Sequence, residues 1–167
     1  MIRPLFAILL LSNVVAVAAP VRLAHEGRAL LPVVVGEKAS TATKATAAEL
    51  AGLLTRISGA TFVVEPGDGS RGIVVGTVAD FGKLPFAVEF GTGPFAREDY
   101  VLRSEKDGVW LVGASALGAE HASWDLLHRL GHRQFFPGET WEVVPETRAL
   151  AIEVDVKESP SFHARRI

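Results

Sequence analysis

The chain has 167 residues, with 17 lysines and arginines, 19 aspartates and glutamates, and no cysteine. The missing cysteines exclude a disulfide framework, a thiolate metal site and a lipid anchor on a processed N-terminal cysteine. The net charge of −2, without a cluster of basic residues, also excludes a typical nucleic-acid-binding protein.

Residues 1–19 are predicted to be a signal peptide. Arg3 gives a short positive start, an apolar run follows, and the small residues Ala16 and Ala18 are typical of a cleavage site. A membrane anchor needs about 20 apolar residues, and Pro20 and Arg22 end this run too early. We therefore expect cleavage after residue 18 or 19, a secreted or periplasmic protein, and no membrane association after cleavage.

The first half of the remaining chain alternates between strand and helix patterns. β-Branched and apolar runs predict strands at 21–23 and 31–35, joined by a turn at 25–28. Thr46 and Glu49 match a capping box ahead of apolar residues at helical spacing, which predicts a helix that ends at Ser58-Gly59. Two further strands, at 61–65 and 72–75, are expected to be adjacent.

The second half begins with an irregular segment. Residues 77–97 predict a long loop with one helical turn near 79–81. The runs at 100–103 and 109–112, separated by Lys106-Asp107-Gly108, predict a hairpin. A second amphipathic helix is expected over 117–130, stopped by Gly131, and short strands at 142–144 and 151–154.

These elements predict an α/β (α+β) two-layer sandwich. The sheet should be mixed and largely antiparallel, because most strands come in adjacent pairs, and the two helices should cover one of its faces. Roughly 150 residues suffice for one domain with a sizeable core, which we place at 20–156, with 157–167 as a linker.

Several short motifs succeed one another over most of this domain. They are the helix end at 53–60, the strand at 73–76, residues 99–103, Val112-Gly113 with Gly118, the helix at 122–130, Gly131-His132-Arg133, Phe136-Pro137-Gly138, Trp141, Val144-Pro145 and residues 158–162. In this order they resemble the N-terminal domain of glycoside hydrolases of the α-glucuronidase and β-hexosaminidase group. The resemblance is nearest to bacterial secreted proteins of the DUF4838 type.

The resemblance implies that catalysis takes place in a different domain. In such enzymes the catalytic carboxylates lie in a barrel that comes after this domain. The chain would then be a non-catalytic accessory domain whose partner is the C-terminal catalytic domain of the same polypeptide. No active-site residue transfers to a position in this sequence.

Two patterns suggest cofactor or metal binding, but their contexts do not fit. Residues 67–72 spell G-x-G-x-x-G, but a strand comes after the last glycine, whereas a dinucleotide site needs a helix there. His128 and His132 are four residues apart, with His121 seven before His128, but Arg129 stands where the zincin motif has glutamate. We therefore predict a turn, hydrogen-bonded or solvated histidines, no cofactor and no metal.

The acidic cluster after the Pro-Gly turn is the place to look for a glycosidase pair, because such enzymes use two carboxyl groups. Glu139, Glu142 and Glu146 form this cluster. Acidic residues interleaved on strands and turns usually form a solvated face, so no catalytic residue is assigned. A small hydrolase that uses Glu139 and Glu142 is the weakest functional alternative.

Carbohydrate contact is the role that the aromatic residues of the same segment suggest. Trp141, Phe135 and Phe136 offer apolar rings on which sugars stack, with Glu142 beside them. Packing in a core is the alternative use of such rings. Besides the small hydrolase, two functions therefore remain open: an accessory domain that packs on a catalytic barrel, and a free-standing secreted carbohydrate-binding module.

Overall fold

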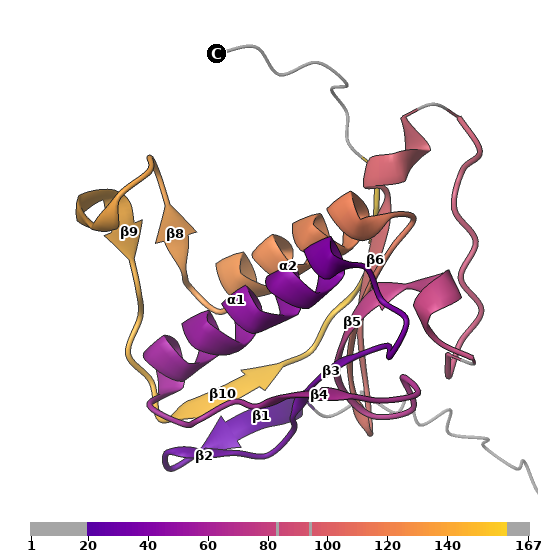
Figure 1. The fold of residues 1–167 in the computed structure, drawn as a ribbon. Helices are drawn as coiled ribbons and strands as arrows, with labels where there is room; N and C mark the ends of the chain where they lie inside the picture. The colour runs from indigo at the N-terminus through magenta and orange to yellow at the C-terminus, as the bar shows by residue number, and fades with distance from the viewer. Residues whose placement is uncertain (1–19, 83, 94, 160–167) are drawn as a thin grey trace, which may run out of the picture.

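The centre of the fold is a six-stranded sheet with strand order β11-β6-β7-β5-β3-β4 (Figure 1). The computed structural model describes residues 20–82, 84–93 and 95–159. The strands are β3 (Val33–Val35), β4 (Val64–Pro66), β5 (Gly72–Thr77), β6 (Tyr100–Glu105), β7 (Gly108–Gly113) and β11 (Asp155–Glu158). Strand β3 is parallel to β4 and β5, and β5 is parallel to β7. Strand β6 is antiparallel to β7 and to β11.

The remaining strands of the described residues form two smaller antiparallel sheets. One has the order β10-β1-β2, from β1 (Val21–His25), β2 (Arg28–Ala29) and β10 (Ala149–Ile152). The other pairs β8 (Arg133–Gln134) with β9 (Glu142–Val143). Short 3₁₀ helices lie at Val78–Asp80, Ala96–Glu98 and Glu139–Trp141.

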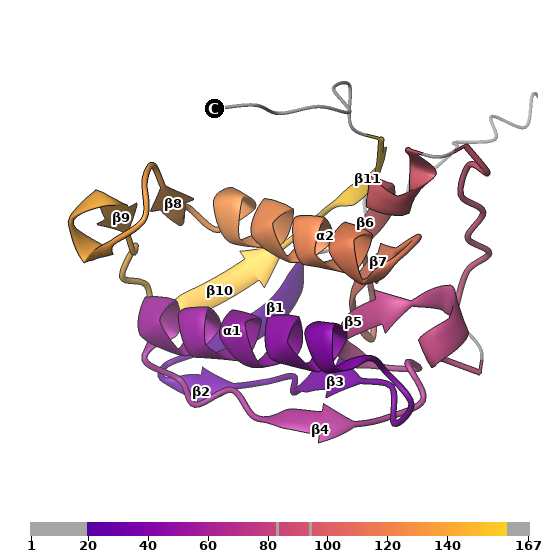
Figure 2. The same ribbon diagram turned by 45° about the horizontal axis from the view of Figure 1, so that its top comes forward.

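Helices α1 (Thr41–Ser58) and α2 (Ala116–Arg129) lie side by side on one face of the sheet (Figures 1 and 2). The main core lies beneath them and includes Leu50, Leu54, Leu111 and Leu126, none more than 1% exposed. The fold is therefore a mixed, largely antiparallel α+β two-layer sandwich, as predicted. Of the strand pairs in the described residues, five are antiparallel and three are parallel.

The start of α1 differs from the prediction. Ser40 is the N-cap, and its Oγ accepts a hydrogen bond from the backbone N–H of Thr43 at 3.1 Å. Thr46 lies inside the helix and donates its hydroxyl to Ala42 O at 3.2 Å, so the capping box at Thr46 and Glu49 was wrong. The predicted end is confirmed, because Gly59 has a φ of 70° and its N–H reaches Thr55 O at 2.8 Å.

The order of the N-terminal strands also differs from the prediction. Strands β4 and β5 are not neighbours, because β3 lies between them and pairs in parallel with both. The turn after His25 joins β1 to β2, and β3 comes separately. Strand β11 has no counterpart among the predicted elements, and it ends at Glu158, two residues beyond the boundary drawn at 156.

The long loop covers the face of the sheet that the helices leave open. Trp110 is 1% exposed on this face, clusters with Val34, Val74 and Val112, and stands edge-on to Phe86 from the loop at 5.8 Å. Its Nε1–H donates to Gly69 O at 2.8 Å. This carbonyl lies in the glycine-rich segment 67–72, which connects β4 to β5 as a turn, as predicted.

The predicted β6–β7 hairpin and α2 are confirmed, and the helical turn predicted near 79–81 lies at Val78–Asp80. No helix within the described residues is long and apolar enough to cross a membrane. The predicted signal peptide and the end of the predicted linker, at 160–167, lie outside the described residues.

Candidate functional site

The candidate site is the β8–β9 hairpin, which projects beyond the end of α2 (Figure 1). The backbone N–H of Gly131 reaches His128 O at 3.0 Å, and that of His132 reaches Leu127 O at 2.9 Å. Gly131 has a φ of 97°, which a residue with a side chain rarely adopts. The predicted stop at Gly131 is confirmed, and it turns the chain out of the helix into the hairpin.

The tip of this hairpin is closed by its own hydrogen bonds. The backbone N–H of Phe135 donates to Trp141 O at 3.0 Å, and that of Trp141 donates to Gly138 O at 3.1 Å. The side-chain amide of Gln134 donates to Phe136 O at 2.6 Å. Gly138 has a φ of 107°, which allows the sharp bend. The tip is therefore a defined loop held by contacts within itself.

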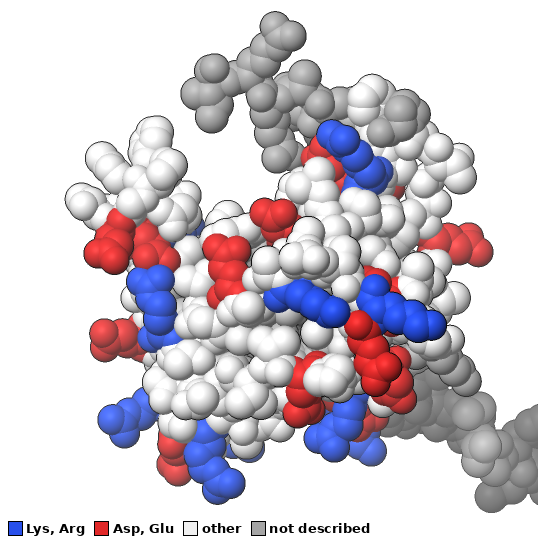
Figure 3. Space-filling model, viewed as in Figure 1, with Lys and Arg blue, Asp and Glu red and all other residues white. Residues whose placement is uncertain are grey.

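Three aromatic side chains at this tip face solvent. Phe135 is 64% exposed, Phe136 is 63% exposed and Trp141 is 52% exposed. The rings of Phe136 and Trp141 stand edge to face, with centroids 5.4 Å apart. Figure 3 shows the outer end of the hairpin as uncharged, with charged side chains nearer its base. We call Phe135, Phe136 and Trp141 the aromatic tip.

Glu142 ties the base of the hairpin to the body of the domain. Arg56 of α1 donates Nη1 to Oε1 at 2.9 Å and Nη2 to Oε2 at 2.7 Å. His132 Nε2 lies 2.9 Å from the same Oε1. The hydrogen bonds from Arg56 and then from His132 lower the pKa of Glu142 to about 2. Both carboxylate oxygens are therefore engaged within the protein. We call Arg56, Glu142 and His132 the clamp.

The tautomer of His132 is set by this arrangement. An ionised carboxylate only accepts hydrogen bonds, so Nε2 carries the proton that points at Glu142. The imidazole is fully buried, and its Nδ1 has no hydrogen-bond partner among the described residues. His132 packs beside Trp124 of α2, with ring centroids 5.8 Å apart. It therefore fixes the hairpin from inside the domain.

The other sequence candidates do not join this site. His128 is exposed, and His121 Nδ1 lies 4.0 Å from Glu98 Oε2. No group of three histidine or acidic side chains in the described part of the chain is arranged to hold a metal ion. Glu139 and Glu146 are exposed, whereas Glu142 is engaged in the clamp.

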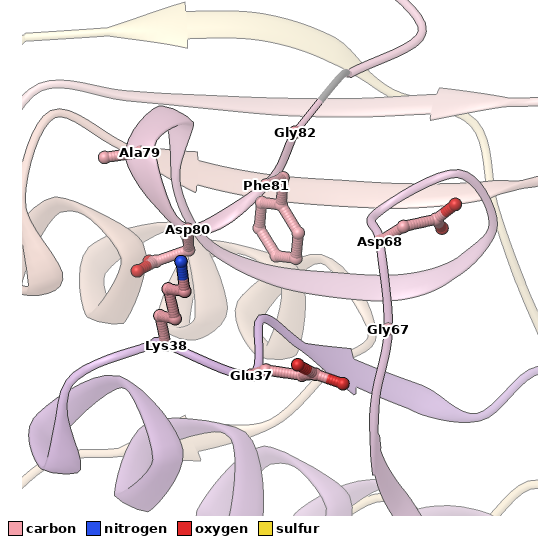
Figure 4. A pocket seen from close by; sticks show the side chains of 8 residues that line it. All are labelled: Glu37, Lys38, Gly67, Asp68, Ala79, Asp80, Phe81 and Gly82. Atoms are coloured by element: carbon pink, nitrogen blue, oxygen red, sulfur yellow. The ribbon is translucent and has the colours of Figure 1, made fainter.

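A separate pocket of about 430 Å³ lies where the parallel strands end. Its lining comes from the segments after β3, β4 and β5, including Lys38, Asp68 and Asp80 (Figure 4). Two of its three acidic side chains cap turns, because Asp80 Oδ2 accepts from Thr77 N at 2.7 Å and Asp68 Oδ1 accepts from Ser70 N at 2.9 Å, whereas the third, Glu37, is exposed. Asp68 and Asp80 are therefore engaged in the turns that line the pocket.

Part of the site was visible in the sequence and part was not. The aromatic residues and Glu142 were named from their local pattern, and the structure brings all four into one hairpin. The contribution of Arg56 was missed, because it lies 86 residues from Glu142 in the sequence. The prediction that His132 is hydrogen-bonded is confirmed, but its partner Glu142 was not foreseen.

The comparisons with known proteins found similarity only to solved structures. No protein-family model matches the chain, and no curated protein matches it. A GH115 4-O-methyl-α-glucuronidase, BtGH115A, with specificity for decorated arabinogalactans, matches 86% of this chain with a TM-score of 0.66 and 14% identity. The GH20 β-N-acetylhexosaminidase from Streptomyces coelicolor A3(2) matches 87% with a TM-score of 0.53 and 21% identity.

The matches cover only part of each solved enzyme. This chain spans 19% of the glucuronidase and 24% of the hexosaminidase. At these identities the likeness concerns the fold, which is shared over nearly the whole described domain. The chain therefore has the fold of a domain that occurs within two larger glycoside hydrolases.

Proposed function

We propose that the chain is the non-catalytic N-terminal accessory domain of a secreted glycoside hydrolase that acts on polysaccharide or oligosaccharide. The observation that carries the proposal is that this chain matches only a small part of each enzyme, although most of this chain is matched. Nearly all of this fold matches a fifth to a quarter of two enzymes that process carbohydrate. Most of each enzyme therefore has no counterpart in this chain.

The proposed partner is a catalytic domain located after this one in the same polypeptide. The residues after β11 would connect to it, and the signal peptide at 1–19 would direct the whole protein to secretion. The motif order, which resembles the DUF4838 type of secreted proteins, supports the same arrangement. In this role the domain buries part of its surface against its neighbour and helps to shape the substrate cleft.

The local chemistry supports an accessory role over a catalytic one. A glycosidase needs two carboxyl groups facing the scissile bond, one of which must be able to donate a proton. Glu142 is held ionised by Arg56 and His132, with a pKa of about 2, so it is unsuited to be that acid near neutral pH. Its neighbours Glu139 and Glu146 are exposed, so neither has the buried surroundings typical of a general acid.

The decisive experiment is to read the gene beyond codon 167 and to assay both the longer product and the 167-residue chain. We expect some 300 further residues of alternating strand and helix, as a barrel requires. Only the longer protein should then hydrolyse aryl glycosides. A stop codon directly after Ile167 would rule out the accessory role. Turnover by the short chain that is lost in Glu142→Gln would instead support a small hydrolase.

A free-standing carbohydrate-binding module is the second candidate function. The exposed aromatic tip favours it, because such rings seldom face solvent without a contact to make. A module of this kind would need no catalytic domain encoded after codon 167, whereas the accessory role requires one. The same gene sequence therefore separates the two functions.

A further inference from the structure

The aromatic tip is the most prominent unexplained surface in the described part of the molecule. Phe135, Phe136 and Trp141 come from one short hairpin and are each more than half exposed. Rings of this size normally bury most of their surface in a core, as Trp110 does here. A cluster of three such rings on one loop therefore points to a contact made outside the domain.

We propose that the aromatic tip stacks against pyranose rings of a carbohydrate chain, and that the clamp holds it in position to do so. The ligand class is a sugar of gluco or xylo configuration. In such sugars the hydroxyl groups are equatorial, so both ring faces present axial C–H bonds to an aromatic surface. This inference deepens the proposed function, on which it rests, by naming the ligand of the hairpin.

The size of the tip favours a sugar over a protein surface. A buried aromatic side chain covers about 150–250 Å², so three rings exposed by half to two-thirds offer roughly 300–450 Å². A specific protein interface needs about 800 Å² from each partner. The tip alone falls well short of that, but it suffices for one or two sugar rings.

The surroundings of the tip also suit a sugar. Glu139 and Thr140 lie between Phe136 and Trp141 in the sequence, are exposed, and carry oxygen atoms that can bond to hydroxyl groups. Sugar sites commonly combine an apolar platform with a few such polar groups, as small-molecule sites do in general. Phe136 and Trp141 pack edge to face, so their ring planes lie at 69° to each other.

The hairpin is already organised in the absence of a ligand. Its tip is closed by the hydrogen bonds of Phe135, Trp141 and Gln134, and its base is held by the clamp. A preorganised platform avoids the cost of ordering side chains on binding. Since both carboxylate oxygens of Glu142 are engaged, Glu142 is a positioning residue and the rings make the contact.

The test is to titrate the purified chain with cellohexaose and with xylohexaose by isothermal calorimetry and tryptophan fluorescence. We expect dissociation constants between about 0.1 and 1 mM for at least one of them. Trp141→Ala and Phe136→Ala should each weaken binding at least about tenfold. Phe95→Ala is the matched control, because Phe95 is 51% exposed but lies outside the hairpin, and it should leave the affinity unchanged.

A test of the clamp must distinguish an effect on the position of the aromatic tip from an effect on the stability of the domain. Glu142→Gln should weaken binding about threefold to tenfold at a temperature where far-UV circular dichroism shows the variant to be fully folded. The near-UV signal of the Phe136–Trp141 pair should change in the same variant. A variant that loses thermal stability but keeps both its affinity and this signal would show that the clamp does not position the tip.

Two results would overturn the proposal. One is the absence of binding to both hexasaccharides up to about 10 mM, and the other is binding that persists in the Phe136→Ala, Trp141→Ala double variant. If the double variant instead prevents association with the catalytic domain, the tip is a protein-docking surface. The accessory role would survive each of these results, because it depends on the domain that the gene encodes after residue 167.

Discussion

Glu142 is the residue on which the position of the hairpin depends, because it links α1, the end of α2 and β9 through a single carboxylate. Its pKa falls from the ordinary value of 4.5 to about 2. Between these two values the unfolded chain binds the proton and the folded chain does not. The stabilisation from Glu142 is therefore fully present above about pH 4.5 and is lost as the pH falls through 2.

We predict that Glu142→Gln lowers the free energy of unfolding at pH 7 by about 1–2 kcal/mol, since a charge-assisted contact with a partly exposed arginine is replaced by a weaker neutral one. The difference from the wild-type chain should shrink as the pH falls from 5 towards 2. Urea denaturation at a series of pH values measures it. A difference that stays constant over this range would show that the clamp does not lower the pKa of Glu142.

Two glycines inside helices should respond in opposite ways to the same substitution. A Cβ at Gly118 of α2 would collide with the backbone carbonyl oxygen of Asp99, and it would lie 3.1 Å from the Cα of Gly113. Gly118→Ala should therefore destabilise the domain by about 2 kcal/mol or more, because backbone atoms cannot move aside easily.

Gly52 of α1 provides the matched control. It is exposed, and a Cβ there would have no neighbour within 4 Å. Gly52→Ala should raise stability by about 0.5–1 kcal/mol, since alanine loses less backbone entropy in a helix. Thermal unfolding of both variants checks the pair, and a similar shift in both would contradict the close approach of α2 to the Asp99 carbonyl.

At the scale of elements, the two possible starts of α1 make different predictions. Ser40 caps the helix through its hydroxyl, whereas Glu49 is exposed in the middle of it. Ser40→Ala should cost about 1 kcal/mol, because one N–H of the first turn loses its acceptor. Glu49→Ala should change stability by less than about 0.5 kcal/mol. A larger loss in Glu49→Ala than in Ser40→Ala would restore the capping box at Thr46.

The elements that were predicted correctly are those with strong local patterns. The β6–β7 hairpin has apolar runs around a Lys-Asp-Gly turn, and α2 has an apolar stripe between Ser115 and Gly131. The first turn of α1 was missed because residues 41–45 are small and polar and carry no apolar period. Local patterns therefore predicted the elements that begin and end at clear signals in their own sequence.

The pairing of strands depended on contacts that no local pattern records. The segments 61–65 and 72–75 are rich in β-branched residues and close in sequence, which favours a hairpin between β4 and β5. They are instead separated by β3, which pairs in parallel with each. The chain passes from β3 through α1 to β4, and a helix of this length is what a parallel connection needs. The clamp was missed for the same reason, because Arg56 and Glu142 meet only through the packing of α1 against the hairpin base.

At the scale of the whole molecule, the aromatic residues divide between two uses. One set fills the core, including the back face of the sheet, where Trp110 packs against the long loop and donates to Gly69 O. The other set stands on the hairpin, outside the core. The division explains why composition alone did not tell a sugar platform from packing.

Truncating one tryptophan from each set tests this division. Trp110→Ala should lower the free energy of unfolding by about 3–5 kcal/mol, since it opens a cavity on the back face and leaves the Gly69 carbonyl without its donor. Trp141→Ala should change it by less than about 0.5–1 kcal/mol, because half of the side chain is already in water. Chemical denaturation of both variants gives the comparison. A Trp141→Ala loss close to that of Trp110→Ala would mean that the aromatic tip belongs to the core of the domain, and that its rings are needed for folding before they are available to any ligand.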